Sequence, residues 1–198
     1  MSADDNLLDQ TIVPAFKDFE KAIEFCANEG LGTQALILTF SAIDFAGWLD
    51  SQDDQRSRDS FEKWVSNYML PHRELGCTAT ELWGARCGLL HTYAPGSRAS
   101  REGEVRELLY SWGNDQAAKL QGYIDTHSKG YKALAVQGQA LIEAFQAGLT
   151  KFLKEIGDDP TRLNLVREKA SKILKTLSQE DREMLFYRQE LLFATLLR

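Results

Sequence analysis

Cysteine is scarce in this 198-residue sequence, and so are the signals of a secreted or membrane protein. Its three cysteines, Cys26, Cys77 and Cys87, are an odd number without paired spacing, which argues against a disulfide framework. No apolar run approaches the roughly 18 to 20 residues of a membrane span. The first ten residues are acidic, unlike a secretory or mitochondrial leader. We therefore predict a cytoplasmic protein with reduced thiols that does not enter a membrane.

Several sequence motifs of enzyme chemistry are also missing. The sequence contains no P-loop, no Gly-x-Gly-x-x-Gly after a strand and no His-Glu-x-x-His. His72, Cys77, Cys87 and His91 carry groups that bind zinc, but their spacing fits no structural zinc site. Neither a repeat nor a low-complexity linker divides the chain, and its length suits one domain over 1–198. We expect neither a metal nor another cofactor.

A general excess of positive charge is absent, because the net charge is -6. The charge is nevertheless uneven: residues 1–55 hold 2 basic and 11 acidic side chains, whereas residues 56–106 hold 8 and 6. A polyanion would therefore bind near the middle of the chain. The alternative is an acidic surface without an electrostatic role. This middle segment contains Arg58, Arg73, Arg86, Arg98, Arg101 and Arg106.

Helical periodicity covers most of the chain and predicts a mainly all-α fold, an antiparallel helical bundle. Thr78 and Glu81 form a capping-box pattern that starts a helix over about 79–94. Pro95 and Gly96 end this helix. Other helices are predicted over 12–28, over 33–49 with Thr33 as N-cap, over 60–70, over 136–156, after Asp159 with Pro160 at N1, and after Ser178.

The segment 97–136 has weaker periodicity than the rest of the chain. Residues 97–103 are polar and predict a loop. Residues 104–136 mix short apolar runs with glycines, a pattern that fits either a hairpin or broken helices. The four tryptophans, among them Trp83, are expected in the core or an interface and not as platforms for base stacking.

Polar side chains interrupt the predicted helix over 33–49, which is otherwise apolar almost all round and should be buried. Ser41 and Asp44 lie three residues apart on one face of it. A buried aspartate costs several kcal/mol unless it is paired or opens into a cavity. Asp44 is therefore either bonded to a neighbouring helix end or part of a functional site, with Ser41 beside it.

The predicted helix over 79–94 also carries unusual residues on its apolar faces. Arg86 lies in one apolar stripe, and a second stripe contains Gly84, Gly88 and His91. Two interior glycines indicate the close approach of a ligand or another backbone. Arg86 and His91 point about 140° apart on a regular helix and are poorly placed to bond. A second copy of the helix across a two-fold axis would bring them into one site.

The string "RCGLLHTY", an Arg-x4-His-x-Tyr pattern from Arg86 through His91 to Tyr93, resembles the HEPN superfamily (higher eukaryotes and prokaryotes nucleotide-binding domain). The resemblance also covers the order of helices across about residues 6–178. It implies a homodimer with facing motifs and, in many members, a metal-independent endoribonuclease that acts as a toxin or defence effector. Arg86 would then hold the cleaved phosphate, and His91 would be the general base or acid. Tyr93 would match a tyrosine that a partner nucleotidyltransferase, acting as antitoxin, modifies.

These residue types suit RNA cleavage. RNA carries its own nucleophile in the 2′-hydroxyl group, so an enzyme needs a group that titrates near neutrality and a fixed cation for the transition state. Histidine and arginine supply both without a metal. We therefore predict a HEPN-like endoribonuclease with Arg86 and His91 as catalytic residues, supported by Asp44, Ser41 and Tyr93. The alternative is a non-catalytic HEPN-like module that binds RNA, nucleotide or a protein partner.

Overall fold

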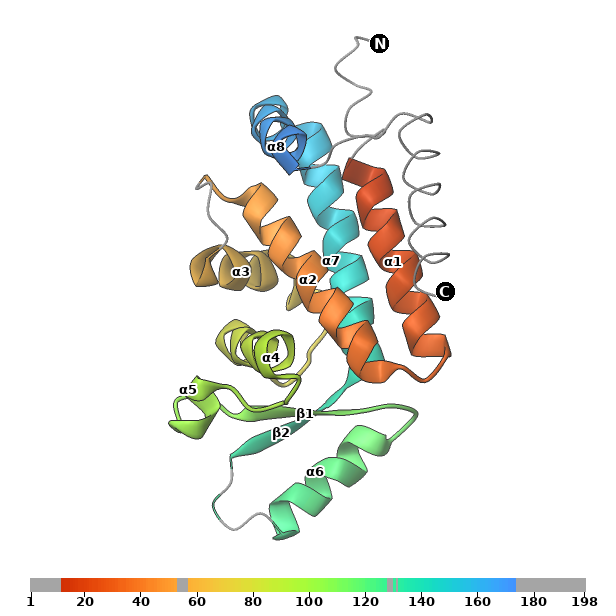
Figure 1. The fold of residues 1–198 in the computed structure, drawn as a ribbon, viewed down its shortest axis with the longest axis vertical. Helices are drawn as coiled ribbons and strands as arrows, with labels where there is room; N and C mark the ends of the chain where they lie inside the picture. Colours follow the sequence, from red (N-terminus) through yellow and green to blue (C-terminus); the bar gives the residue numbers. More distant parts are fainter. Residues whose placement is uncertain (1–11, 53–56, 128–129, 131, 174–198) are drawn as a thin grey trace, which may run out of the picture.

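The computed structural model describes residues 12–52, 57–127, 130 and 132–173, and over these ranges the fold is mainly helical (Figure 1). This confirms the predicted fold class. The helix expected after Ser178 lies outside the described residues. The elements are α1 (Val13–Asn28), α2 (Gly32–Asp50), α3 (Arg58–Trp64), the π-helix η2 (Val65–Met69), α4 (Ala79–Thr92), α5 (Arg98–Arg101), β1 (Glu107–Ser111), α6 (Gln116–His127), β2 (Ala133–Gln137), α7 (Gly138–Asp158) and α8 (Pro160–Ile173).

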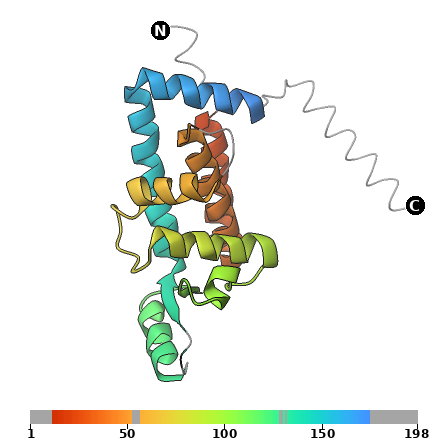
Figure 2. The same ribbon diagram turned by 90° about the vertical axis from the view of Figure 1, so that its left-hand side faces the viewer.

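The central helix of the bundle is α2, as its apolar composition predicts. It contacts α1, α3, α4, α7 and α8, and every residue from 42 to 49 is buried. Helices α1 and α7 lie alongside it (Figure 1). Helices α3 and α4 cross the bundle, one above the other, and α8 lies across one end (Figure 2). Because α2 is buried without a break from residue 42 to 49, a polar side chain in that stretch must find its partner inside the protein.

The predicted N-terminal ends of helices are confirmed where a capping side chain is present. Thr78 and Glu81 form the expected capping box at α4, with the Thr78 amide donating to Glu81 Oε2 at 2.9 Å and the Glu81 amide to Thr78 Oγ1 at 3.2 Å. Asp159 accepts from the amide of Thr161 at 2.9 Å and begins α8. The predicted cap Thr33 is wrong, because α2 already begins at Gly32 after Leu31.

The apolar run at 60–70 forms two elements instead of one regular helix. It begins as α3 and continues as the π-helix η2, which packs on α7. Gly148 of α7 permits this approach, because a Cβ atom there would lie 2.7 Å from the carbonyl oxygen of Tyr68. The wider turn therefore occurs where the backbone of η2 meets the backbone of α7.

The segment 97–136 differs from both sequence-based alternatives. The expected polar loop contains the single-turn helix α5. The following residues form a β1–α6–β2 unit whose two strands are parallel, with Leu109 opposite Ala135, so neither a hairpin nor a set of broken helices is present there. Parallel strands need a long crossover connection, and α6 supplies it. The unit lies at the end of the bundle opposite α8 (Figure 1).

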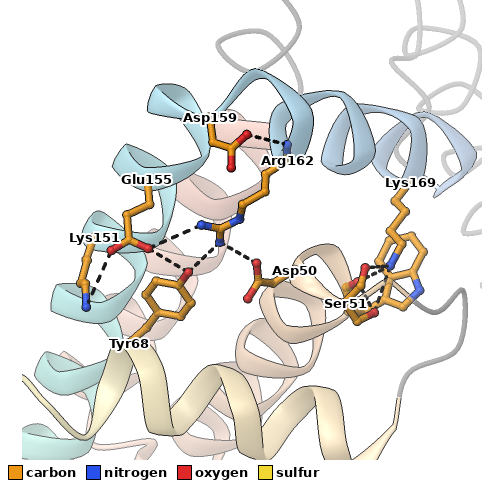
Figure 3. Close-up of polar contacts among 9 residues, drawn as sticks. Asp50, Ser51, Tyr68, Lys151, Glu155, Asp159, Arg162 and Lys169 are labelled. Carbon is orange, nitrogen blue, oxygen red and sulfur yellow. Dashed lines mark hydrogen bonds and ion pairs between the residues drawn. The ribbon is translucent and has the colours of Figure 1, made fainter.

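Two basic side chains of α8 fasten this helix to the bundle (Figure 3). Lys169 is only 1% exposed, and its ammonium group donates to the Trp48 carbonyl at 2.8 Å, to Ser51 Oγ at 3.0 Å and to the Ser51 carbonyl. It therefore adds a charged donor to the carbonyl groups at the C-terminal end of α2, where the Trp48 carbonyl also accepts from the amide and the hydroxyl of Ser51. Arg162 Nη2 donates to Asp50 Oδ1 and to the Tyr68 hydroxyl, both at 2.6 Å.

We predict that Lys169→Met lowers the free energy of unfolding by about 2 to 4 kcal/mol, because the end of α2 then loses a buried, charged hydrogen-bond donor. Chemical denaturation followed by circular dichroism would measure the change. The matched control is Lys172→Met in the same helix, whose side chain is exposed and pairs with Glu168. We expect this control to change stability by less than about 0.5 kcal/mol. Equal losses of stability in the two variants would contradict the proposed role of Lys169 in holding α8 on α2.

Candidate functional site

The candidate site is built around an ion pair between α2 and α4. Arg86 Nε donates to Asp44 Oδ2 at 2.8 Å, and Arg86 Nη2 lies 2.6 Å from the same oxygen. The two side chains are 16% and 7% exposed. The buried aspartate of the central helix thus has its partner in the arginine of the motif helix. Breaking such a pair by removing one side leaves the other charge poorly solvated.

His91 completes this cluster at the end of α4. Its Nε2 lies 3.1 Å from Arg86 Nη1. A guanidinium group only donates hydrogen bonds, so a hydrogen bond at this distance requires Nε2 to accept, as it does in the imidazole tautomer with its proton on Nδ1. The expectation that Arg86 and His91 are poorly placed to bond within one helix is therefore wrong. The helical wheel gives the directions of the Cα–Cβ bonds, whereas the long arginine side chain reaches across the turn between them.

The guanidinium group of Arg86 also contacts Trp83 and Cys87. Its Cζ lies 4.9 Å from the centre of the Trp83 ring, and Nη1 lies 4.0 Å from Cys87 Sγ. Burial lowers the pKa of Arg86, but the hydrogen bond and the charge of Asp44 outweigh burial and raise the pKa above its ordinary value. Arg86 is therefore a fixed cation whose Nη1 faces His91 while Nε and Nη2 face Asp44.

Tyr93 lies beside this cluster but faces a different partner. It is the C-cap of α4 in the left-handed conformation, with φ 54°, and its side chain is 60% exposed. Its hydroxyl accepts a hydrogen bond from Gln34 Nε2 of α2 at 2.7 Å. The side chain thus spans from the end of the motif helix to the start of the central helix.

The predicted supporting residue Ser41 does not extend the cluster. Its hydroxyl donates to the carbonyl of Ile37 at 2.8 Å, one turn earlier in α2. This bond within the helix is common for serine in a buried helix. The structure thus brings together Asp44, Arg86 and His91, sets Tyr93 beside them, and gives Ser41 a local role.

Sequence reasoning missed three neighbours of the cluster. Trp83 and Cys87 contact the Arg86 guanidinium, and Gln34 holds Tyr93. The spacing of Trp83, three residues before Arg86, fits a contact on one helix face and would have indicated it. No comparable signal identifies Gln34, because it lies on a different helix 59 residues away.

The two glycines of α4 lie against the chain's own residues, Gly88 against backbone and Gly84 against side chains. A Cβ atom on Gly88 would lie 2.6 Å from the Ala94 carbonyl oxygen and 3.0 Å from that of Gly96. On Gly84 it would lie 3.3 Å from Ser97 Oγ and from Val105 Cγ2. The sequence correctly indicated a close approach, and residues 94–105 of the same chain make it by folding back over α4.

Comparison with known proteins gives no match: no family model, no curated protein and no solved structure is similar to this chain. In the ranges that the structure describes, no helix has the length and apolar character needed to cross a membrane. Among the same residues, no group of three or more histidine, cysteine, aspartate or glutamate side chains is arranged to hold a metal ion.

We predict strong energetic coupling between Asp44 and Arg86. In a double-mutant cycle with Asp44→Asn and Arg86→Met, the coupling free energy should exceed about 1 kcal/mol, because both groups are largely desolvated. Urea unfolding of the four proteins would measure it. The control cycle uses the exposed pair Arg98–Glu102, which is joined at 2.8 Å, and should give about 0.5 kcal/mol or less. Similar coupling in both cycles would contradict the buried pair as an anchor.

We also predict that Gly88→Ala destabilises the protein by about 1 to 3 kcal/mol, because the new methyl group overlaps the Ala94 carbonyl. Gly122→Ala in α6 is the matched control, since nothing lies within 4 Å of its Cβ position. There alanine should raise stability by up to about 1 kcal/mol. Thermal unfolding at several protein concentrations would separate the two effects. A loss for Gly88→Ala that appears only as a dimer dissociates would favour an intermolecular contact instead.

Proposed function

We propose that this protein is a metal-independent endoribonuclease of the HEPN type, as its Arg-x4-His-x-Tyr string implies. The observation that carries the proposal is the 3.1 Å contact between Arg86 Nη1 and His91 Nε2, with Arg86 anchored on Asp44. A fixed cation and a neutral imidazole thus lie side by side at one end of α4. These are the two groups that cleavage by the 2′-hydroxyl requires.

The geometry suggests how a phosphate would enter this pair. Arg86 keeps Nε and Nη2 on Asp44, while Nη1 exchanges His91 for a phosphate oxygen. His91 Nε2 is then free to accept the proton of the 2′-hydroxyl group. The 2′-oxygen forms a bond to phosphorus, the bond from phosphorus to the 5′-oxygen breaks, and the 5′-oxygen leaves with a proton. The products are a 2′,3′-cyclic phosphate and a 5′-hydroxyl end.

A homodimer would complete this site. With two copies facing each other, one neutral His91 takes the proton of the 2′-hydroxyl, and the other, protonated as imidazolium, gives its proton to the leaving 5′-oxygen. His91 and Tyr93 are both exposed at the end of α4, where a second copy has access. The same exposure leaves the Tyr93 hydroxyl within reach of a nucleotidyltransferase that would act as antitoxin. We propose a toxin or defence role on this basis.

A non-catalytic module is the second candidate, and one observation favours it. Arg86 is already bonded to Asp44 and His91 in the protein without RNA, so the motif also has a structural role in fastening α4 to α2. In that case the protein binds RNA, nucleotide or a protein partner without cleaving it. RNA cleavage assays on variants with one site residue replaced at a time distinguish the two candidates.

We predict that the purified protein cleaves mixed RNA in excess chelator and that His91→Ala reduces the rate by at least about 100-fold. His91 is the decisive position because its side chain is exposed, whereas Arg86→Ala would also leave Asp44 without its guanidinium partner. The matched control is His72→Ala, which is exposed and lies outside the cluster. Product ends would be identified by mass spectrometry. Cleavage that needs a divalent ion, or that survives His91→Ala, would contradict this mechanism.

A further inference from the structure

An open cavity of about 540 Å³ lies next to the Arg86–His91 cluster and is not explained by it. Its wall is formed by α4, by α5 together with the segment between α5 and β1, and by the start of α3. A volume of this size is typical of sites for small molecules. The side chains that matter for its chemistry are Arg58, Thr80, Trp83, Cys87, Arg98 and Glu104.

The cavity and the candidate catalytic residues share one face of α4. Thr80, Gly84, Cys87 and His91 follow one another at helical spacing, and the first three line the cavity. From Cys87 to His91 is about 6 Å along the helix axis. Trp83 and Cys87 belong to both places, because they line the cavity and also contact the Arg86 guanidinium. A strand that follows this face of α4 from His91 would reach the cavity at Cys87.

The lining offers an aromatic surface and cations. Trp83 is half-buried and packs edge-on against Phe61 with ring centres 5.4 Å apart, so its ring is held in place. Bases stack favourably on such a ring, and the stacking tolerates any base. This role differs from the sequence-based expectation that the tryptophans serve only in the core or an interface.

Two arginines of the cavity are already paired, but only at the surface. Arg58 bonds Glu62 at 2.6 Å and Arg98 bonds Glu102 at 2.8 Å. Exposed pairs of this kind contribute little to stability, so a phosphate group can replace the carboxylates at little cost. Glu102 and Glu104 both line the cavity, and their two carboxylates oppose the binding of several phosphates at once. The charge balance suits one nucleotide and not a polyphosphate.

We propose that this cavity binds one nucleotide of the RNA strand, the one adjoining the cleaved phosphate, with its base against Trp83 and its phosphate at Arg58 and Arg98. The assignment of RNA as the ligand rests on the proposed function, whereas the cavity and its nucleotide chemistry stand on the geometry alone. The site would explain why a chain with a net charge of -6 still holds its substrate close to His91. A free mononucleotide has the same chemistry and serves as the probe.

The test is a titration of the ¹⁵N-labelled protein with adenosine 5′-monophosphate, followed through the indole N–H signals of the four tryptophans. The Trp83 signal is assigned with Trp83→Phe. We expect the Trp83 signal to shift and those of Trp48, Trp64 and Trp112 to stay in place. Ala99→Trp fills the cavity from α5 and should weaken binding by at least about tenfold. Its matched control, Ala118→Trp on the exposed face of α6, should bind as the unaltered protein does.

A second pair of variants tests the phosphate contacts without filling the cavity. The double variant Arg58→Gln, Arg98→Gln should bind adenosine 5′-monophosphate about tenfold more weakly and should bind adenosine as the unaltered protein does. Arg73→Gln, which removes an arginine paired with Glu143 elsewhere, should change neither. Inorganic phosphate alone should not shift the Trp83 signal. A shift with phosphate alone, or no shift of Trp83 at millimolar nucleotide, would overturn the proposal.

Failure of this proposal and failure of the proposed function give different results. If His91→Ala cleaves RNA normally but Ala99→Trp still abolishes nucleotide binding, the cavity stands and the ribonuclease does not. If His91→Ala is inactive but Ala99→Trp cleaves RNA at the normal rate and KM, the ribonuclease stands and the cavity is overturned. If both hold, adenosine 5′-monophosphate should compete with RNA in the cleavage assay. Nucleotide binding without competition would assign the cavity to a free nucleotide and overturn the RNA subsite.

Discussion

The ion pair between Asp44 and Arg86 is the constraint on which the candidate site depends. It joins the most buried helix, α2, to the motif helix α4 and leaves Arg86 Nη1 facing His91. A carboxylate this deep in a helical core requires a partner, and the arginine requires a counter-charge for the same reason. The pair therefore fixes the relative position of the two helices and the orientation of the guanidinium group together.

Helix α4 has to meet several neighbours with only 14 residues. One side bonds α2 through Arg86, and the glycine positions accept the chain that folds back from residues 94–105. The remaining stripe, from Thr80 to His91, faces the cavity and the end of the helix. This division explains why small, aromatic and charged residues alternate in a segment that is otherwise apolar. The composition reflects three different surfaces and not a weak helix.

Sequence reasoning found the helices wherever periodicity and caps agree, as at Thr78 and Asp159, because both signals are local. It failed at β1 and β2, since a parallel pair depends on partners some 26 residues apart in sequence and leaves no local mark. Asp44, Arg86 and His91 were identified as residues that need an explanation. The contact between Arg86 and His91 was missed because the helical wheel ignores side-chain length. Nor does a sequence state whether the backbone near Gly88 belongs to the same chain.

The parallel sheet ties the two halves of the chain together at the end of the bundle. Strand β1 contacts α4, and β2 ends at Gln137, directly before α7 begins at Gly138. A tight turn cannot join parallel strands, so α6 is a necessary part of the path. Cutting residues 112–132 down to a short loop would force β2 to run in the opposite direction. Helix α7 would then leave the sheet pointing away from the core. The β1–α6–β2 unit therefore determines the direction in which α7 runs, and it cannot be shortened without changing the packing of α7.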